Sequence, residues 1–178
     1  GYINETGAIA EINESIIHLP VASPVYTDLN FGSYKIKYPA QKMVQMPDIK
    51  ASESTALRLA MLFLNTPYLW GGKSSFGMDC SGFTQQVFKL MGIALPRDAY
   101  QQVTTGETID FLQQARCGDL AYFDNEQGDI IHVGMLLNSN SIIHASGYVR
   151  VDAIDHLGII NTITGKRSHS LRIIKRMF

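Results

Sequence analysis

Apolar residues in the middle of the chain recur at the three-to-four-residue spacing of amphipathic helices. One pattern opens at Ser52-Glu53, and its apolar positions are Leu57, Ala60, Met61 and Leu64. A second pattern opens at Cys80, and its apolar positions are Phe83, Val87, Leu90 and Met91. Gly92 follows where a C-terminal cap is expected. The spacing therefore predicts two helices, and the second begins at Cys80.

From Gly118 onward the pattern changes to short apolar runs that are typical of β-strands. These runs cover residues 119–123, 130–137, 141–146, 148–152 and 171–177. A short third helix is expected before them, over residues 108–114. Because helices precede strands, the order favours an α+β domain with an antiparallel sheet over an alternating α/β fold.

The first 48 residues differ from the rest of the chain. They contain short β-like pieces, such as residues 9–12 and 34–38, which are broken by Asn, Gly and Pro. We place a boundary near Pro47-Asp48, which divides the chain into a β-rich segment, 1–48, and a second domain, 49–178. A chain of 178 residues is long enough for one well-packed domain with a small appendage.

The composition indicates a globular protein, with 46% hydrophobic residues, 17% charged residues and a formal net charge of -1. The Lys and Arg residues are scattered among Asp and Glu, so we expect no nucleic-acid partner. No apolar run approaches the roughly 20 residues that cross a bilayer, so we expect no membrane span. We expect a monomer. The chain begins with Gly1 and not with methionine, which is compatible with removal of a leader and leaves the compartment open.

The two cysteines provide neither a disulfide framework nor a Cys-x-x-Cys zinc spacing. We interpret Cys117, before a predicted strand, as structural. Cys80 is placed where unpaired N–H groups and the positive end of a helix dipole favour a reactive thiolate. The alternative is a small buried hydrophobe. Upstream, Pro67, Gly71 and Gly72 belong to a loop that can lie close to a substrate.

His132 and His144 lie within apolar strand patterns, where a polar ring needs a partner. The alternative to a catalytic histidine is a core histidine whose ring nitrogens are hydrogen-bonded. The remaining histidines, which we interpret as surface residues, are His18, His156 and His169. Zinc could take Cys80, His132 and His144, but their spacing matches no common zinc signature. We therefore expect no metal and no cofactor.

The relation between these two histidines follows from the loop that joins their strands. If residues 138–140 form a three-residue hairpin loop, Leu137 pairs with Ser141. His144 then lies opposite Gly134 and diagonal to His132, with both imidazoles on one face of the sheet. A base oriented by a second polar group, facing a cysteine at a helix N-terminus, is typical of cysteine-histidine hydrolases.

Six short motifs together resemble the NlpC family of bacterial cell-wall cysteine peptidases. They are Tyr68-Leu69-Trp70-Gly71-Gly72, Asp79-Cys80-Ser81-Gly82-Phe83, Leu95-Pro96-Arg97, Cys117-Gly118-Asp119-Leu120, His132-Val133-Gly134 and Ile143-His144-Ala145-Ser146. Their order and spacing match over about residues 52–152. The resemblance implies a papain-like α+β fold in which a helix presents the cysteine to a histidine on the sheet. The segment 1–48 is similar to the end of a bacterial SH3-like domain.

The resemblance also implies roles for individual residues. Cys80 is the implied nucleophile, His132 the general base and later acid, and His144 the residue that orients His132. Tyr68 lines the site, and its hydroxyl and the Cys80 N–H are candidates for stabilising the oxyanion.

Four further residues are implied on the substrate side, namely Asp79, Ser81, Trp70 and Arg97. Asp79 and Ser81 match positions that recognise the amino-terminal L-alanine of a peptide, and Asp79 is also a candidate helix N-cap. Arg97 is a candidate for a substrate carboxylate, and a structural or solvated arginine is the alternative.

The implied reaction is hydrolysis of the amide between γ-D-glutamate and a diamino acid in a peptidoglycan stem peptide, through a thioester. The substrate is peptidoglycan or a free murein peptide. One alternative is an N-acetylmuramoyl-L-alanine amidase on a related scaffold. Another is an inactive module that binds cell wall or peptide. We expect the cell envelope, periplasmic or secreted, with cytoplasmic peptide recycling as the alternative compartment.

Overall fold

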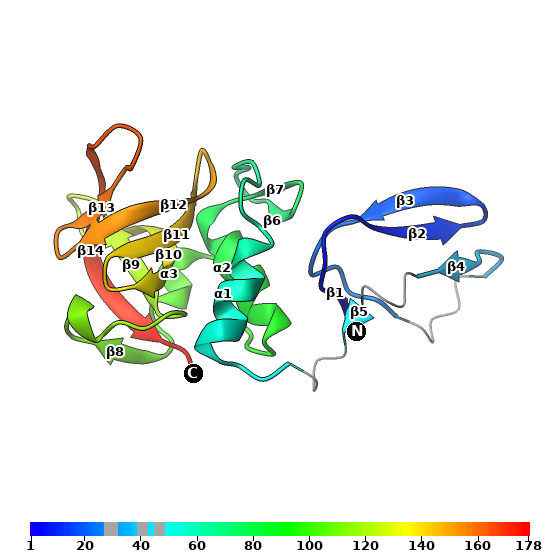
Figure 1. Cartoon of the computed structure of the whole chain (residues 1–178), viewed down its shortest axis with the longest axis horizontal. Helices are drawn as coiled ribbons and strands as arrows, with labels where there is room; N and C mark the ends of the chain where they lie inside the picture. Colours follow the sequence, from blue (N-terminus) through cyan, green and yellow to red (C-terminus); the bar gives the residue numbers. More distant parts are fainter. Residues whose placement is uncertain (27–31, 39–42, 45–48) are drawn as a thin grey trace.

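The computed structural model describes residues 1–26, 32–38, 43–44 and 49–178. Figure 1 shows a β-rich part formed by the start of the chain beside a larger part in which helices pack against a curved sheet. The helices of the larger part are α1 Glu53–Met61, α2 Cys80–Leu90, α3 Ala99–Gln102 and a 3-10 helix, Leu112–Gln114. Its strands are β6 Lys73–Ser74, β7 Gly77–Met78, β8 Glu107–Ile109, β9 Leu120–Asp124, β10 Ile130–Asn138, β11 Ser141–Ser146, β12 Tyr148–Asp155, β13 Gly158–Ile160 and β14 Arg167–Arg176.

The main sheet has seven antiparallel strands in the order β13-β12-β11-β10-β9-β14-β8. Strand β14 pairs with β9 along one edge, and along its other edge it pairs with β13 near its start and with β8 near its end. The pairing between β13 and β14 joins the two sides of the sheet, so the sheet curls until it closes on itself. A closed sheet leaves few unpaired edges.

The two faces of this sheet bury different sets of apolar side chains, because successive strand residues point to opposite faces. One face carries Leu120, Val133 and Ile143, which pack with residues of α1 and α2 such as Leu59 and Phe83. The face inside the curl encloses a second cluster, which consists of Ile109, Leu112, Ala121, Phe123, Leu136, Ile142, Ile154, Ile159 and Ile174. The sheet is therefore fixed both to the helices and to its own far side.

The start of the chain forms two small sheets. Strand β1, Tyr2–Ile3, pairs with β5, Met43–Val44, and strands β2, Ala8–Ile12, β3, Ser15–Leu19, and β4, Ile36–Lys37, form a three-stranded sheet. The Lys89 ammonium on α2 donates to the Ala22 carbonyl at 3.0 Å and lies 4.6 Å from the centre of the Tyr2 ring. These contacts join the β-rich part to the helix that begins at Cys80.

The two main helices are confirmed at their predicted starts. Ser52 caps α1 by accepting from the Thr55 N–H, and α2 begins at Cys80. The predicted helix over 108–114 is wrong, because Thr108 lies in β8 and only the 3-10 turn remains helical. The helix α3 and the strand β13 were not predicted. The expected boundary at Pro47-Asp48 lies outside the described residues, and the division into domains stays a prediction.

The β10-β11 hairpin confirms the predicted face but corrects the loop. Asn138, and not Leu137, pairs with Ser141, which leaves a two-residue turn. A bulge between Leu136 and Asn138 then shifts the register by one residue, so Gly134 lies opposite His144 as predicted. Among the described residues, no helix is long and apolar enough to cross a membrane.

Candidate active site

The N-terminus of α2 is built around Asp79. Its backbone is extended, with φ -92° and ψ 179°, and its Oδ1 accepts from the Gly82 N–H at 2.7 Å. This is the geometry of an N-cap, which supplies one of the partners that the first turn of a helix lacks. The predicted capping role of Asp79 is therefore confirmed, and the cap fixes Cys80 as the first residue of the helix.

The Asp79 carboxylate also ties the Gly71 loop and Arg97 to this helix start. Its Oδ2 accepts from the Gly71 N–H at 2.8 Å and from Arg97 Nη2 at 2.6 Å, while Arg97 Nη1 lies 3.1 Å from Oδ1. Burial opposes ionisation, but hydrogen bonds from Arg97, Gly82 and Gly71 lower the pKa of Asp79. Arg97 also donates to Ser81 Oγ at 3.0 Å. The structure thus places Arg97 in an ion pair with Asp79.

A close backbone approach explains the glycine two residues after the cysteine. A Cβ added at Gly82 would lie 2.3 Å from the Gly72 carbonyl oxygen, well inside van der Waals contact. The same carbonyl accepts from the Asp79 N–H at 3.2 Å. The loop after Tyr68 therefore packs directly on the first turn of α2, which only glycine at position 82 permits.

The Cys80 thiol is buried at the junction of α2 and β10. Burial raises the pKa of this thiol, and the Val133 N–H acts in the opposite direction because it stabilises the thiolate. The neighbouring Asp79 carboxylate raises the pKa further, and the balance lies above the ordinary value for cysteine. Sequence reasoning expected an activated thiolate, whereas the structure favours a neutral thiol at rest. Val133 follows His132 in the chain, so the sulfur lies beside the strand segment that carries the predicted base.

His132 and His144 are hydrogen-bonded to each other, with His132 Nε2 and His144 Nδ1 2.8 Å apart. On its other side, His144 Nε2 lies 3.0 Å from Asp152 Oδ2. Since Nε2 of His132 is occupied by His144, Nδ1 is the nitrogen left to take a proton from the thiol. No hydrogen bond joins Cys80 to His132 in the described residues, and such contacts often tighten only when substrate binds. Asp152 was missed by sequence reasoning.

His169 is a second residue that sequence reasoning missed. It was expected at the surface, but its ring stacks on His132 with centroids 4.1 Å apart and an interplanar angle of 24°. Phe123 contacts both rings, at centroid distances of 5.7 and 5.9 Å. Burial lowers the pKa of His132 well below its ordinary value, and His169 and His144 lower it further. The base is therefore neutral at rest.

A pocket of about 650 Å³ opens in front of the cysteine. It is lined by Tyr68, Trp70, Gly71, Asp79, Cys80, Ser81, Arg97, Asp98, Ala99, Tyr100, Ile130 and Ile131. All six predicted residues outside the histidine pair thus line one cavity, and His132 and His144 are not among its lining residues. Trp70 is 86% exposed at this pocket. Burial and the neighbouring Cys80 and Asp79 raise the pKa of Tyr68, so its hydroxyl stays protonated at neutral pH.

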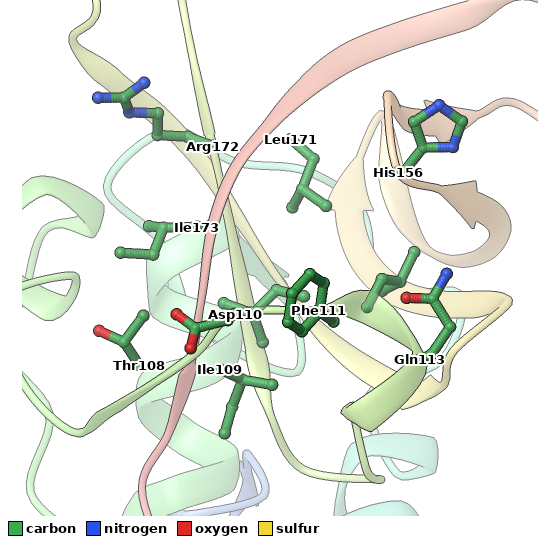
Figure 2. A pocket seen from close by; sticks show the side chains of 11 residues that line it. Thr108, Ile109, Asp110, Phe111, Gln113, His156, Leu171, Arg172 and Ile173 are labelled. Carbon is green, nitrogen blue, oxygen red and sulfur yellow. The ribbon is translucent and has the colours of Figure 1, made fainter.

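A separate pocket of about 350 Å³ lies between β8, the 3-10 helix and β14. Figure 2 shows its lining, with Leu171 and Ile173 on the strand that crosses it and Phe111 and Gln113 to the right of that strand. None of the predicted site residues lines it. The six predicted residues that line the pocket in front of Cys80 are therefore absent from this one.

Curated relatives resemble the chain over part of their own length. A γ-D-glutamyl-L-lysine dipeptidyl-peptidase of Bacillus cereus is 31% identical over 156 residues, which cover 85% of this chain and 44% of that protein. A γ-D-glutamyl-L-lysine dipeptidyl-peptidase of Bacillus subtilis is 39% identical over 98 residues, which cover 54% of this chain and 33% of that protein. The chain thus spans less than half the length of these two relatives.

Solved structures show the same fold. An NlpC/P60 family protein from Bacillus cereus aligns with a TM-score of 0.72 at 22% identity, over 98% of this chain and 62% of that one. The peptidoglycan hydrolase RipB of Mycobacterium tuberculosis aligns with a TM-score of 0.55 at 23% identity, over 71% of this chain and 64% of that one. The NlpC/P60 family model matches residues 65–168, which include the helix of Cys80 and the strands of both histidines. The chain belongs to the NlpC/P60 family.

Proposed function

We propose that this chain is a cysteine peptidase that cleaves an amide bond in murein stem peptides. The observation that carries the proposal is the Cys80 thiol, which lines a large pocket at the start of α2 and lies beside the strand segment of the hydrogen-bonded His132 and His144. A nucleophile, a base and a group that orients the base are the parts that acyl transfer needs.

The first half of the reaction forms a thioester. His132 Nδ1 takes the thiol proton as the Cys80 sulfur attacks the carbonyl carbon, so the neutral resting pair is converted to an ion pair only during attack. The carbonyl oxygen becomes an oxyanion, for which the Cys80 N–H and the Tyr68 hydroxyl are the proposed donors. Each such donor contributes about 3–4 kcal/mol in well-studied hydrolases. The C–N bond then breaks, and His132 returns the proton to the leaving amine.

The second half removes the acyl group. His132 takes a proton from water, whose oxygen attacks the thioester carbon, and the C–S bond breaks. The sulfur leaves with the proton from His132, which restores the thiol and releases a carboxylic acid. No cofactor is required for this sequence, because each proton is exchanged between Cys80, His132, the substrate and water.

The proposed bond lies between γ-D-glutamate and a diamino acid. The names of the Bacillus relatives support this choice, since both are γ-D-glutamyl-L-lysine dipeptidyl-peptidases. The proposed substrate is peptidoglycan or a free murein peptide that begins with L-alanine.

Recognition of the peptide's amino terminus is assigned to Asp98 more readily than to Asp79. Both residues line the pocket, but the Asp79 carboxylate is already neutralised by Arg97 and bonded to two backbone N–H groups. Asp98 forms no ion pair within the described part of the chain. An ammonium therefore gains more from Asp98, because a carboxylate without an ion-pair partner is a better acceptor than one that shares its charge with Arg97.

The substitution Asp98→Asn tests this assignment. We expect KM for L-Ala-γ-D-Glu-L-Lys to rise about tenfold, which corresponds to a loss of about 1.4 kcal/mol of binding free energy. The amino-terminally acetylated peptide lacks the ammonium, so its KM should be the same in both proteins. An equal rise for both peptides would contradict the assignment.

The reaction itself is tested with Cys80→Ala, and Cys117→Ala is the matched control. Mass spectrometry of L-Ala-γ-D-Glu-L-Lys digests should show free lysine with the wild type and with Cys117→Ala, and none with Cys80→Ala. Cleavage by Cys80→Ala would overturn the proposal. In digests of cell wall, a product cut between muramic acid and L-alanine would instead identify the amidase alternative. Peptide binding without cleavage by the wild type would identify an inactive binding module.

A further inference from the structure

The Asp152 side chain ends a row of polar groups that crosses three neighbouring strands. His132 lies on β10, His144 on β11 and Asp152 on β12. Because Gly134 pairs with His144, and Ile142 with Asp152, each step in the row is a diagonal neighbour across the sheet. The register of the sheet therefore fixes the order of the three groups.

Asp152 is buried, with its side chain 1% exposed, and both of its oxygens have donors. Oδ1 accepts from Arg150 Nη2 at 2.8 Å and from the Thr162 N–H and hydroxyl at 2.9 and 2.8 Å. Oδ2 faces His144. Burial opposes ionisation, but the hydrogen bonds from His144, Thr162 and Arg150 hold the pKa of Asp152 well below its usual range. The group is thus a carboxylate, which accepts hydrogen bonds and donates none.

The protonation of both imidazoles follows from this carboxylate. His144 must carry its proton on Nε2 in order to donate to Asp152, which leaves Nδ1 as an acceptor in the neutral ring. His132 must then carry its proton on Nε2 in order to donate to His144. The lone pair of His132 is left on Nδ1, the nitrogen that has to receive the thiol proton.

We infer that Asp152 is a positioning residue, which acts through His144 to hold His132 in the one neutral tautomer that can accept the proton of the Cys80 thiol. The inference rests on the proposed function for the reaction but not for the hydrogen-bond row itself. Asp152 does not line the pocket in front of Cys80. It is therefore expected to affect the chemical step and not the binding of peptide.

Replacing Asp152 with Asn should reverse the direction of the hydrogen bonds along the row. Arg150 Nη2 and the Thr162 N–H can only donate to Oδ1, so the amide oxygen of an asparagine would remain there and its NH₂ would face His144. His144 Nε2 would then have to accept, His144 Nδ1–H would donate to His132, and His132 would carry its proton on Nδ1. That tautomer presents a proton, and no lone pair, to the thiol.

The first test uses the unmodified protein and no peptide. Nitrogen-15 NMR of histidine-labelled protein at neutral pH distinguishes protonated from unprotonated ring nitrogens. We expect Nε2 protonated and Nδ1 unprotonated in both His132 and His144. A proton on Nδ1 of either ring would overturn the inference, whether or not Asp152→Asn folds.

The second test compares Asp152→Asn with Asp155→Asn. Asp155 lies on the same strand, and its carboxylate is paired with Arg167 at 2.6 Å, so it is a matched carboxylate outside the row. We expect kcat of Asp152→Asn to fall by about 10²- to 10⁴-fold, with KM within twofold of wild type. In serine proteases, a wrong tautomer of the catalytic imidazole lowers kcat by an amount in this range. Its spectrum should show the reversed tautomers. Asp155→Asn should retain both kcat and the wild-type spectrum.

These outcomes separate the inference from the proposed function. A wild-type protein that cleaves no peptide but shows the expected tautomers would refute the function and leave the row as inferred. An active wild type in which folded Asp152→Asn keeps the original tautomers and its kcat would refute the inference alone. His169, whose ring stacks on His132, and Arg150 also face this row, so both variants are compared at several pH values between 6 and 8.

Discussion

Gly134 provides the space in which the two histidines meet. A Cβ at this position would lie 2.8 Å from the His144 Cβ and 2.7 Å from the Ile142 Cδ1. Neither neighbour can move freely, because both are buried in the sheet. The absence of a side chain at position 134 is thus part of the geometry that holds His144 against His132.

Gly134→Ala should therefore reduce activity as well as stability. Overpacking costs about 1–3 kcal/mol of the free energy of unfolding, and a displacement of about 1 Å in a positioning group can cost roughly 100-fold in rate. We expect kcat to fall by about 10- to 100-fold, measured beside urea unfolding. Gly128→Ala is the control, because that loop position has space around it but a φ of +85°. Gly128→Ala should lose stability and keep the wild-type kcat. A folded Gly134→Ala variant with wild-type kcat would contradict the positioning role of Gly134.

At the scale of single residues, the sequence predicted the site well where local spacing decides the geometry. Strand parity placed His132 and His144 on one face, although the loop was one residue shorter than expected, because the bulge compensated. The same reasoning could have found Asp152. Because Ser146 pairs with Tyr148 around Gly147, alternation along β12 places Asp152 on the same face of the sheet as His144. His169 could not be found in this way, because its place beside His132 depends on strands that are distant in the chain.

Among the elements, α1 and α2 were predictable because each has a cap and an apolar stripe of its own. The error over residues 108–114 has a different cause. Ile109 and Leu112 are three residues apart, as in a helix, but Ile109 pairs with Ile174 on β14. Pairing with a strand more than 60 residues away overrides the local pattern there, and the local sequence carries no sign of it.

The caps of α1 and α2 offer a matched comparison, because each is a side chain that accepts from a backbone N–H three residues on. Ser52→Ala should cost about 0.5–2 kcal/mol of the free energy of unfolding and leave kcat unchanged. Asp79→Ala should cost at least as much and also lower kcat/KM, because Gly71 and Arg97 lose their partner beside Cys80. Urea unfolding and peptide cleavage measure the two effects. If Asp79→Ala lost stability alone, its role would be limited to the cap.

For the whole molecule, the histidines inside the curled sheet predict how stability depends on pH. Burial lowers the pKa of His169 to about 4, with His144 lowering and Asp152 raising it, and burial also lowers the pKa of His132. An unfolded histidine has a pKa of about 6.5. Between these values the unfolded chain binds protons that the native protein does not, so stability falls as pH decreases from about 6.5 toward 4.

Three aspartates with lowered pKa values, Asp79, Asp152 and Asp155, affect this slope only at its acid end. Their contribution is complete well above the unfolded aspartate pKa of about 3.9 and is lost as pH falls below about 5. The decline between pH 6.5 and 5 therefore reports the buried histidines, and His169→Phe, which keeps an aromatic ring against His132, should make it shallower. His18→Phe, at an exposed position on β3, controls for the loss of a histidine as such. Thermal unfolding at pH 7.5, 6.5, 5.5 and 5.0 measures the slope. Equal slopes for His169→Phe and wild type would show that His169 binds its proton at the same pH in the native protein as in the unfolded chain.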